Sequence, residues 1–327
     1  MLGRTIVPQS PDAGLTHTKD TQKMTFVRIF MAGCVAALLA TPSQAQDLTG
    51  TLKKIKETGA ITIGYRESSV PFSYLDDHQK PVGFAMDICA KIVDAVKTEL
   101  KLPNLEVKYN PVTSATRIPL IANGTVDLEC GSTTNNAARQ KQAAFTNTHF
   151  LTATRFVSKK TSAVKSLDDL KGKTAVSTSG TTNIKQMNDV NTEKKLGINI
   201  IPAKDHAEAF LMVETDRAVA FGMDDILLAG FVAGARDPSL YVISDFTLSK
   251  PEPYGIMLRR DDPAFKAVAD KATAALYASP EGLALYDKWF TKPINKAGLN
   301  LNFPIPSALK KEFAHPSDSP DPSAYAD

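Results

Sequence analysis

The fold is indicated first by residues 61–74, which read ITIGYRESSVPFSY. This stretch begins with a strand pattern over 61–65 and passes at Arg66 into a polar loop. Beyond it lies a run whose apolar residues have the spacing of one helix face: Ala85, Ile88, Cys89, Ile92, Val93, Val96 and Leu100. A strand followed by such a helix is typical of a βαβ unit, from which mostly parallel sheets are built.

The same alternation continues along the chain in two series. The first series has strand patterns at 105–109 and 126–130 and a helical pattern at 117–122. The second series has strand patterns at 173–177, 198–201 and 218–223, with helices that begin near Thr182, Asp205 and Asp225. Two such series predict an α/β protein with two lobes, each a mostly parallel sheet flanked by helices.

The composition is that of a globular protein. The chain has 327 residues, of which 43% are hydrophobic and 22% charged, and this length is enough for two domains of ordinary size. The formal net charge is only +3. Nucleic-acid binding would require a dense basic patch, so we expect no nucleic-acid partner.

The first 45 residues have the pattern of a signal peptide. Arg28 precedes an apolar stretch over 29–40, and small residues lead to a cleavage site after Ala45. Met24 is an alternative start, because residues 1–23 are polar and lack this pattern. The apolar stretch is shorter than the roughly 20 residues that span a bilayer. We therefore expect a soluble mature protein in the periplasm, in preference to a buried N-terminal helix.

Cys89 and Cys130 are the two cysteines of the predicted mature chain. Export would permit a disulfide between them, and two buried free thiols are the alternative, because spacing alone does not fix the geometry. The chain has no Cys-x-x-Cys sequence, and its five histidines are scattered. We expect neither a metal site nor a cofactor.

Polar side chains follow the predicted strands at the points where the strands end. These residues are Arg66, Ser132 to Thr134, Ser179 to Thr182, His206 and Asp224. In α/β sheets, ligands bind beyond the carboxyl ends of the strands, where helix N-termini supply backbone N–H donors. The clustering therefore predicts a ligand site at these strand ends.

Several stretches resemble one family. They are similar to stretches of glutamate/aspartate periplasmic binding proteins of ABC transporters, which are family 3 extracellular solute-binding proteins. The similar stretches are residues 66–74, 129–136, 179–182, 203–206, 223–225 and 287–290. The matching stretches run in order from about Leu52 to Phe303. The stretches at 66–74 and 129–136 are the ones more specific to the branch that binds acidic ligands.

The resemblance implies a type II periplasmic-binding-protein fold with a ligand cleft between two lobes. Lobe I would comprise residues 50–151 plus 253–318, and lobe II residues 152–252. The chain would cross between the lobes near Thr152 and Tyr254. Residues 319–327 are expected to form a loose tail.

The resemblance also implies which residues hold an amino acid by its α-carboxylate. Arg139 would hold this group together with Ser132 and Thr134, through guanidinium geometry and helix N-terminal N–H groups. Ser179 and Thr181 would add contacts from the second lobe as the cleft closes.

Further residues would hold the rest of an acidic amino acid. Asp224 would accept the ammonium group. Arg66 and Arg117, together with Ser114 and His206, would hold the side-chain carboxylate. Each charge of the ligand then has a partner, which burial requires because an unpaired buried charge is very costly.

The expected function is therefore capture of L-glutamate or L-aspartate by a monomer that delivers it to an inner-membrane ABC permease. One alternative is an enzyme on the same fold, such as a prephenate or arogenate dehydratase, for which Glu67 and Glu129 are the candidate general acids. Another alternative is an amino-acid-binding protein of broad specificity. The sequence does not rank aspartate against glutamate, since one methylene contributes only about 1–3 kcal/mol to discrimination.

Overall fold

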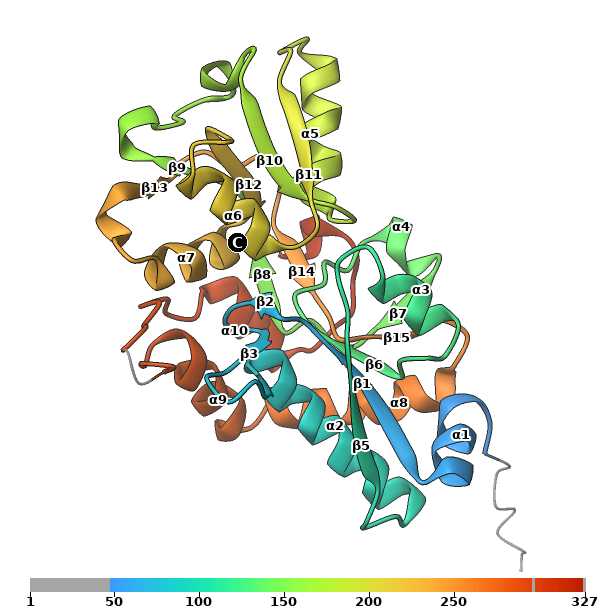
Figure 1. The fold of residues 1–327 in the computed structure, drawn as a ribbon. Helices are drawn as coiled ribbons and strands as arrows, with labels where there is room; N and C mark the ends of the chain where they lie inside the picture. The colour runs from blue at the N-terminus through green and yellow to red at the C-terminus, as the bar shows by residue number, and fades with distance from the viewer. Residues whose placement is uncertain (1–47, 296–297, 326–327) are drawn as a thin grey trace, which may run out of the picture. The chain divides into compact units, whose positions relative to one another are not determined.

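The computed structural model describes residues 48–295 and 298–325, which Figure 1 shows from blue to red along the chain. The predicted signal peptide, residues 1–45, lies outside the described residues. Two larger sheets and the helices packed on them make up the described part of the chain. This is the predicted α/β class, with the elements arranged in two lobes.

The first sheet has the strand order β5 (Glu106–Pro111), β1 (Ala60–Tyr65), β6 (Leu128–Cys130), β15 (Met257–Arg259) and β7 (Ala143–Phe145). Strand β1 is parallel to both β5 and β6. Strand β15 is antiparallel to β6 and to β7, so it alone runs against the other strands of this sheet. The carboxyl ends of β5, β1 and β6 therefore meet at one edge.

Helix α2 (Phe84–Leu100) follows the predicted pattern closely. Its apolar stripe is buried and packs on β6 and on α8 (Pro263–Tyr277). The helix begins after Gly83, whose φ is 139°. A Cβ at Gly83 would overlap the carbonyl oxygen of Phe72, so only glycine fits this close approach between the helix start and the loop.

Further helices and a small sheet accompany the first sheet. The helices are α1 (Gly50–Thr58), α3 (Arg117–Ala122), α4 (Ala137–Gln140), α9 (Pro280–Phe290) and α10 (Ser307–Ala314), with the 3₁₀ turn η4 (Pro322–Tyr325). A small antiparallel sheet comprises β2 (Ser68–Ser69), β3 (Ser73–Leu75) and β4 (Pro81–Val82).

The second sheet has the strand order β11 (Asn199–Ala203), β10 (Thr174–Thr178), β12 (Ala220–Asp224), β9 (Thr154–Lys159) and β13 (Tyr241–Ile243). Strand β10 is parallel to β11 and β12, and β9 is antiparallel to β12 and β13. Helices α5 (Thr182–Glu193), α6 (His206–Glu214) and α7 (Asp225–Gly234) pack on it, and η1 (Lys160–Ser162), η2 (Leu167–Leu170) and η3 (Pro238–Leu240) complete the lobe.

Two helices of this second lobe begin at side-chain caps. The Thr181 side chain accepts a hydrogen bond from the backbone N–H of Ile184 at the start of α5. The Asp205 carboxylate accepts one from the backbone N–H of Glu208 at the start of α6. Because these caps follow directly after β10 and β11, they fix the helix N-termini next to the carboxyl ends of the strands.

The chain passes between the two sheets along two neighbouring strands. Strand β8 (Phe150–Thr152) leads from the first sheet to the second, and β14 (Glu252–Tyr254) leads back. The two strands pair in antiparallel register. Around them, the rings of Phe72, Phe150, Tyr254 and Phe290 pack against one another and are buried.

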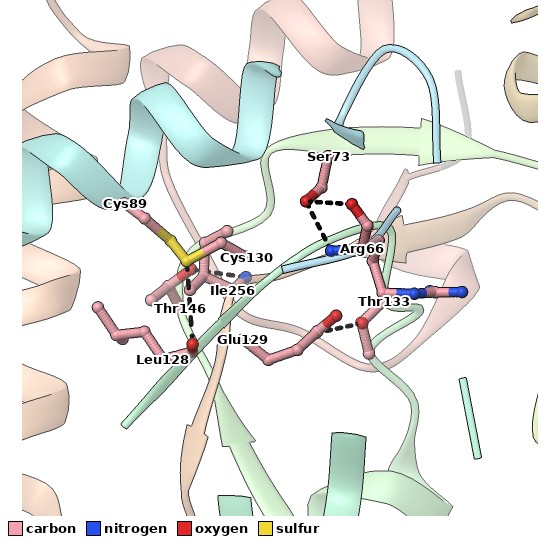
Figure 2. Close-up of a disulfide and its surroundings, with 9 residues drawn as sticks. All are labelled: Arg66, Ser73, Cys89, Leu128, Glu129, Cys130, Thr133, Thr146 and Ile256. Atoms are coloured by element: carbon pink, nitrogen blue, oxygen red, sulfur yellow. Dashed lines mark hydrogen bonds between the residues drawn. A yellow bond between two sulfur atoms is a disulfide. The ribbon is translucent and has the colours of Figure 1, made fainter. Parts of the chain in front are cut away.

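Cys89 and Cys130 form a disulfide. Of the two alternatives that the sequence left open, a disulfide and two free thiols, the structure therefore has the first. The bond joins α2 to the end of β6, and their Cα atoms lie 6.2 Å apart (Figure 2). Both cysteines are fully buried. The cross-link therefore lies inside the first lobe, directly before the polar segment that begins at Gly131.

The prediction of a loose tail over 319–327 is wrong for residues 319–325. The Tyr325 ring is buried, with 4% of the residue exposed. Its hydroxyl lies 2.9 Å from the hydroxyl of Thr148 and donates to the carbonyl oxygen of Ser319 at 2.7 Å. The polar composition of this segment suggested a loose tail, but the segment contains one aromatic residue, Tyr325, whose burial favours packing against the protein.

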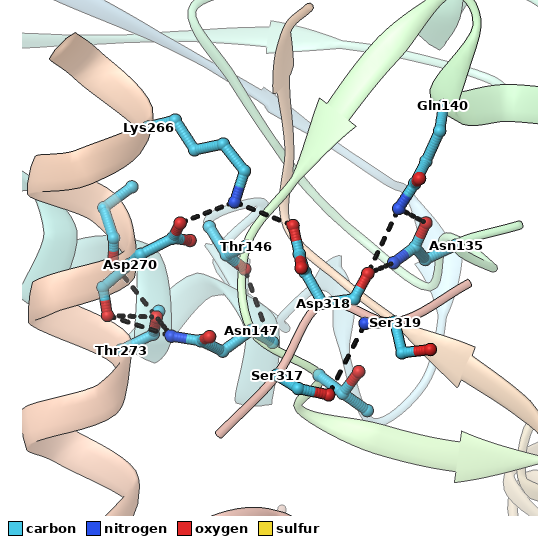
Figure 3. Close-up of polar contacts among 12 residues, drawn as sticks. Asn135, Gln140, Thr146, Asn147, Lys266, Asp270, Thr273, Ser317, Asp318 and Ser319 are labelled. Atoms are coloured by element: carbon cyan, nitrogen blue, oxygen red, sulfur yellow. Dashed lines mark hydrogen bonds and ion pairs between the residues drawn. The ribbon is translucent and has the colours of Figure 1, made fainter. Parts of the chain in front are cut away.

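The segment just before this tail is also held in place. The carbonyl oxygen of Asp318 accepts hydrogen bonds from the side-chain amides of Asn135 at 2.9 Å and Gln140 at 3.1 Å (Figure 3). The Asp318 carboxylate pairs with Lys266 at 2.8 Å. The C-terminal segment thus packs behind α4, the short helix that carries Arg139.

Within the described ranges, no helix combines the length and the apolar character needed to cross a membrane. The same ranges hold no group of three His, Cys, Asp or Glu side chains arranged to bind a metal ion.

Candidate functional site

A small cavity lies between the carboxyl ends of strands from the two sheets. Its lining residues are Ser114, Arg117, Ser132, Thr134, Arg139, Thr181, Thr182, Asn183, His206, Met223 and Asp224. The open volume is about 10 Å³, which is the room for roughly one water molecule. The lining is almost entirely polar, so the cavity suits a small charged ligand.

Arg66 follows the end of β1 and is buried, with 2% of the residue exposed. One of its terminal nitrogens, Nη2, donates to Ser114 Oγ at 2.9 Å and lies 3.3 Å from His206 Nε2. The contact with His206 joins the first lobe to the second. Burial and, next, the neighbouring Arg117 lower the pKa of Arg66 to about 10, which leaves the guanidinium charged at neutral pH.

His206 begins α6 and is fully buried. Its Nδ1 atom lies 2.8 Å from the hydroxyl of Thr178. Burial, followed by the positive charges of Arg66 and Arg117, lowers the pKa of His206 well below its ordinary value. The imidazole is therefore neutral at physiological pH, and it contributes hydrogen bonding without charge.

Arg117 is the first residue of α3 and has 2% of its surface exposed. Its Nη1 donates to the carbonyl oxygen of Ser132 at 3.1 Å and to the hydroxyl of Thr133 through a short hydrogen bond. The same nitrogen lies 3.8 Å from a carboxylate oxygen of Glu129. These contacts hold the guanidinium at the floor of the cavity.

Arg139 lies on α4 and is 7% exposed. Its Nη1 donates to the carbonyl oxygen of Thr134 at 2.9 Å, and its Nη2 donates to that of Gly180 at 3.2 Å. The second bond crosses between the lobes. Burial, and then repulsion by Arg117, lower the pKa of Arg139 to about 9.

Asp224 ends β12 on the opposite side of the cavity and is 4% exposed. Its carboxylate accepts a hydrogen bond from the side-chain amide of Asn183 at 2.8 Å and a short one from the hydroxyl of Tyr254. Burial raises the pKa of Asp224, and these two donors oppose the rise. The pair of donors fixes one carboxylate where a cation in the cavity would meet it.

Several buried polar atoms around the cavity have no hydrogen-bond partner among the described residues. The donors among them are Nη1 of Arg66, Nε of Arg117 and the hydroxyl of Ser132. Leaving such a donor unsatisfied costs roughly 1–3 kcal/mol, and more when the group is charged. All three groups can donate to an anionic oxygen, so the site is built to receive anionic groups.

Most of the predicted site residues converge on this cavity. The predicted residues that line it are Ser114, Arg117, Ser132, Thr134, Arg139, Thr181, His206 and Asp224. Arg66 does not line the cavity itself, but its guanidinium contacts two residues that do, Ser114 and His206. Ser179 does not line the cavity and is half-buried. Strand β10 ends at Thr178, whose hydroxyl contacts His206, and Ser179 lies in the turn that follows.

Sequence reasoning missed Asn183 and Tyr254, which hold Asp224. Asn183 lies in the first turn of α5, two residues after the cap Thr181, and that position was the available signal. Tyr254 was expected only at a crossing between lobes. It comes from a strand far from Asp224 in the sequence, and no local pattern shows that the two residues meet.

Neither carboxylic acid considered for an enzymatic alternative reaches the cavity. Glu67 is exposed, and Glu129 lies beneath Arg117 and Thr133 without lining the cavity. A general acid must lie within hydrogen-bond reach of the atom that it protonates. The geometry of the described residues therefore favours binding over catalysis.

Residues 61–292 match the family described as bacterial extracellular solute-binding proteins, family 3. An L-glutamate/L-aspartate-binding protein from Pseudomonas aeruginosa is 56% identical over 285 residues, which cover 87% of this chain and 94% of that protein. A glutamate/aspartate import solute-binding protein from Escherichia coli is 48% identical over 289 residues, which cover 88% and 95%. A solved structure of a mutant of ArgBP from T. maritima is 28% identical, with a TM-score of 0.64, covering 73% of this chain and 99% of that one.

These matches bear on the predictions made from the sequence. The family match covers more than half of the chain, and both sequence relatives are named as binding proteins of solutes rather than as enzymes. The predicted fold class and the prediction that the chain is not an enzyme are thereby confirmed. The chain is a member of the bacterial extracellular solute-binding proteins, family 3.

Proposed function

We propose that this chain binds L-aspartate or L-glutamate in the cavity between its lobes and delivers the amino acid to an ABC permease in the inner membrane. The observation that carries the proposal is the meeting of three buried arginines and one buried aspartate around a single small cavity. The names of the relatives from Pseudomonas aeruginosa and Escherichia coli support the same ligands.

The charge of the site matches that of an acidic amino acid. Arg66, Arg117 and Arg139 supply three positive charges, and the carboxylates of Asp224 and Glu129 oppose two of them. With the neighbouring Glu252 protonated, the formal charge of this group is therefore +1. Free aspartate and glutamate carry two carboxylates and one ammonium, for a net charge of −1, so a buried complex is neutral overall. Such neutrality matters because burial of net charge is costly.

Each charged group of the ligand has a partner in the proposal. Arg139, with Ser132 and Thr134, binds the α-carboxylate, which all amino acids share. Asp224 accepts the ammonium group. The free Nη1 of Arg66 and Nε of Arg117 are donors for the side-chain carboxylate, and they are the feature that selects acidic ligands.

Around these charged groups, neutral side chains complete the pocket. Ser114 and His206 are already bonded to Arg66 and hold its guanidinium in place. Thr181 lines the cavity from the second lobe. We leave Ser179 out of the proposed ligand contacts because it does not line the cavity.

Binding requires the lobes to move apart and close again. The cavity has room for about one water molecule, and an amino acid is several times larger. Polar contacts cross between the lobes at Arg66 with His206, at Arg139 with Gly180, and at the hydroxyls of Thr134 and Thr182, which are 3.4 Å apart. A ligand that bridges both lobes binds the closed form better and shifts the population toward it.

We propose lobe I as residues 50–151 plus 253–318 and lobe II as residues 152–252. The passage of the chain through β8 and β14 supports these boundaries. The protein would act as a monomer in the periplasm, where a permease can distinguish the closed, loaded form from the open one by shape.

Calorimetric titration of the purified protein with a panel of amino acids tests this function. Aspartate and glutamate should bind with micromolar or tighter dissociation constants, which corresponds to about 8 kcal/mol or more. Glutamine is the matched control, because it has the shape of glutamate without the second charge. Tenfold tighter binding of glutamine or of a neutral aliphatic amino acid than of both acidic ones would refute the proposal.

A further inference from the structure

Glu129 occupies the floor of the site without touching the cavity. It lies on β6, the strand next to β1 in the first sheet, and is fully buried. One carboxylate oxygen, Oε2, accepts a hydrogen bond from the hydroxyl of Thr133 at 2.5 Å (Figure 2). This hydroxyl accepts in turn from Arg117. The other oxygen, Oε1, has no hydrogen-bond partner among the described residues and lies 3.8 Å from Arg117 Nη1.

The same carboxylate lies close to Arg66. A Cβ placed on Gly131 would overlap both Oε1 of Glu129 and Cγ of Arg66, so these two side chains approach each other across the glycine. Burial and then Arg117 lower the pKa of Arg66 to about 10 and that of Arg139 to about 9, and in both cases Glu129 acts in the opposite direction. Glu129 thus opposes the repulsion among the buried guanidinium groups, and beside Arg139 it acts together with the larger effects of Asp224 and Glu252.

We propose that Glu129 is a specificity-determining residue: by holding the formal charge of the site at +1, it makes the site favour acidic amino acids over dicarboxylates that lack the ammonium group. The inference rests on the proposed function and concerns the same cavity. Glu129 acts through the charge that it adds beneath Arg117 and Arg66, and not by contact with the ligand.

The reason is the balance of charge in a site that excludes water. With Glu129 ionised, the ligand that neutralises the site has a net charge of −1, as aspartate has. Succinate has the carbon skeleton of aspartate without the amine, and its net charge is −2, so its complex would bury an excess negative charge. Without Glu129 the site has a formal charge of +2, which succinate neutralises and aspartate does not.

Glu129→Gln tests this directly, because glutamine keeps the shape and can still accept from Thr133. Dissociation constants for L-aspartate and succinate are measured at pH 6. Burial and the neighbouring Asp224 raise the pKa of Glu252 to about 7, so Glu252 is mainly protonated at this pH. The ratio of the two constants should shift toward succinate by about tenfold, the scale expected for one charge across a pocket with an effective dielectric constant near 20. Glu67→Gln removes the same charge from an exposed position and should leave the ratio unchanged.

Two results would overturn the inference. In the first, both ligands weaken by the same factor in Glu129→Gln, which indicates a purely structural role. In the second, Glu129→Asp, which keeps the charge, shifts the ratio as far as glutamine does. If Glu129→Gln is too unstable to titrate, Glu129→Met replaces it, because an apolar side chain of similar volume often substitutes for a buried ionic partner.

A second measurement separates this inference from the proposed function. Sulfate should raise the Tm of Glu129→Gln more than that of the wild type or of Glu67→Gln, because the uncompensated site attracts an anion more strongly. If the wild type bound neither acidic amino acid, the proposed function would fail while the sulfate comparison still decided the role of Glu129. Equal sulfate responses in all three proteins would contradict the charge that we assign to it.

Discussion

Reduction of the disulfide between Cys89 and Cys130 should destabilise the protein by an amount that follows from its place in the chain. The two cysteines are 41 residues apart in sequence. Cross-linking a loop of that length removes conformational entropy from the unfolded chain worth about 4 kcal/mol at 25 °C. Both cysteines are fully buried, and reduction removes no side-chain atoms, so it creates no cavity.

Urea unfolding of the oxidised and the reduced protein measures this difference. The reduced protein is prepared by unfolding with a reductant and refolding in its presence. Because m rises with the surface exposed on unfolding, and the reduced chain unfolds further, both the midpoint and m should be fitted. The Cys89→Ala/Cys130→Ala variant is the matched control, and its midpoint should not respond to the reductant.

The reasoning fails if the oxidised and reduced proteins unfold with free energies within about 1 kcal/mol of each other, well below the value for a loop of this length. It also fails if the double alanine variant responds to the reductant. Ligand affinity at low denaturant should change little on reduction, because the pairing of β1 with β6 holds Cys130 in register with Tyr65.

Three further predictions concern ligand binding and pH. Arg139→Ala should abolish binding of every amino acid, whereas Arg117→Ala should selectively weaken the binding of acidic ones. If calorimetry shows equal losses of affinity for aspartate and for a neutral ligand in both variants, the roles of the two arginines are misassigned. Saturating aspartate should lower the radius of gyration in small-angle scattering, and identical profiles would argue against closure of the lobes. Burial and the nearby Asp224 raise the pKa of Glu252 from 4.5 to about 7, so the folded state keeps a proton that the unfolded state loses between these values. Stability should therefore fall as pH rises from 5 to 7, on the order of 2 kcal/mol, and urea midpoints of Glu252→Gln should lose most of this dependence.

The order of strands and helices was predictable because each follows from local periodicity. The apolar face of α2 repeats at helical spacing, and its predicted residues Ala85 to Leu100 are buried in the structure. The predicted start of α6 at Asp205 corresponds to the observed cap. The tail was misjudged because one buried ring, Tyr325, outweighs its polar neighbours, and local composition does not show where a ring finds its partners.

Most of the candidate site was also predictable, because the carboxyl ends of parallel strands meet at one edge of a sheet. This rule brings Ser132 and His206 to the cavity, and Arg66 next to them, from three separate strand ends. Ser179 follows the end of β10 in the same way but does not line the cavity, and its role stays a prediction.

By itself, the sequence determined the class of fold, the kinds of charge offered to a ligand and the strand ends that carry them. Only the tertiary structure decided which of these charges meet. The disulfide between Cys89 and Cys130, the hold of Tyr254 on Asp224, and the position of Glu129 beneath Arg117 each join residues from different elements. The physical reason is that periodicity and capping act within one element, whereas hydrogen bonds and ion pairs depend on distances that are fixed only when the elements pack together.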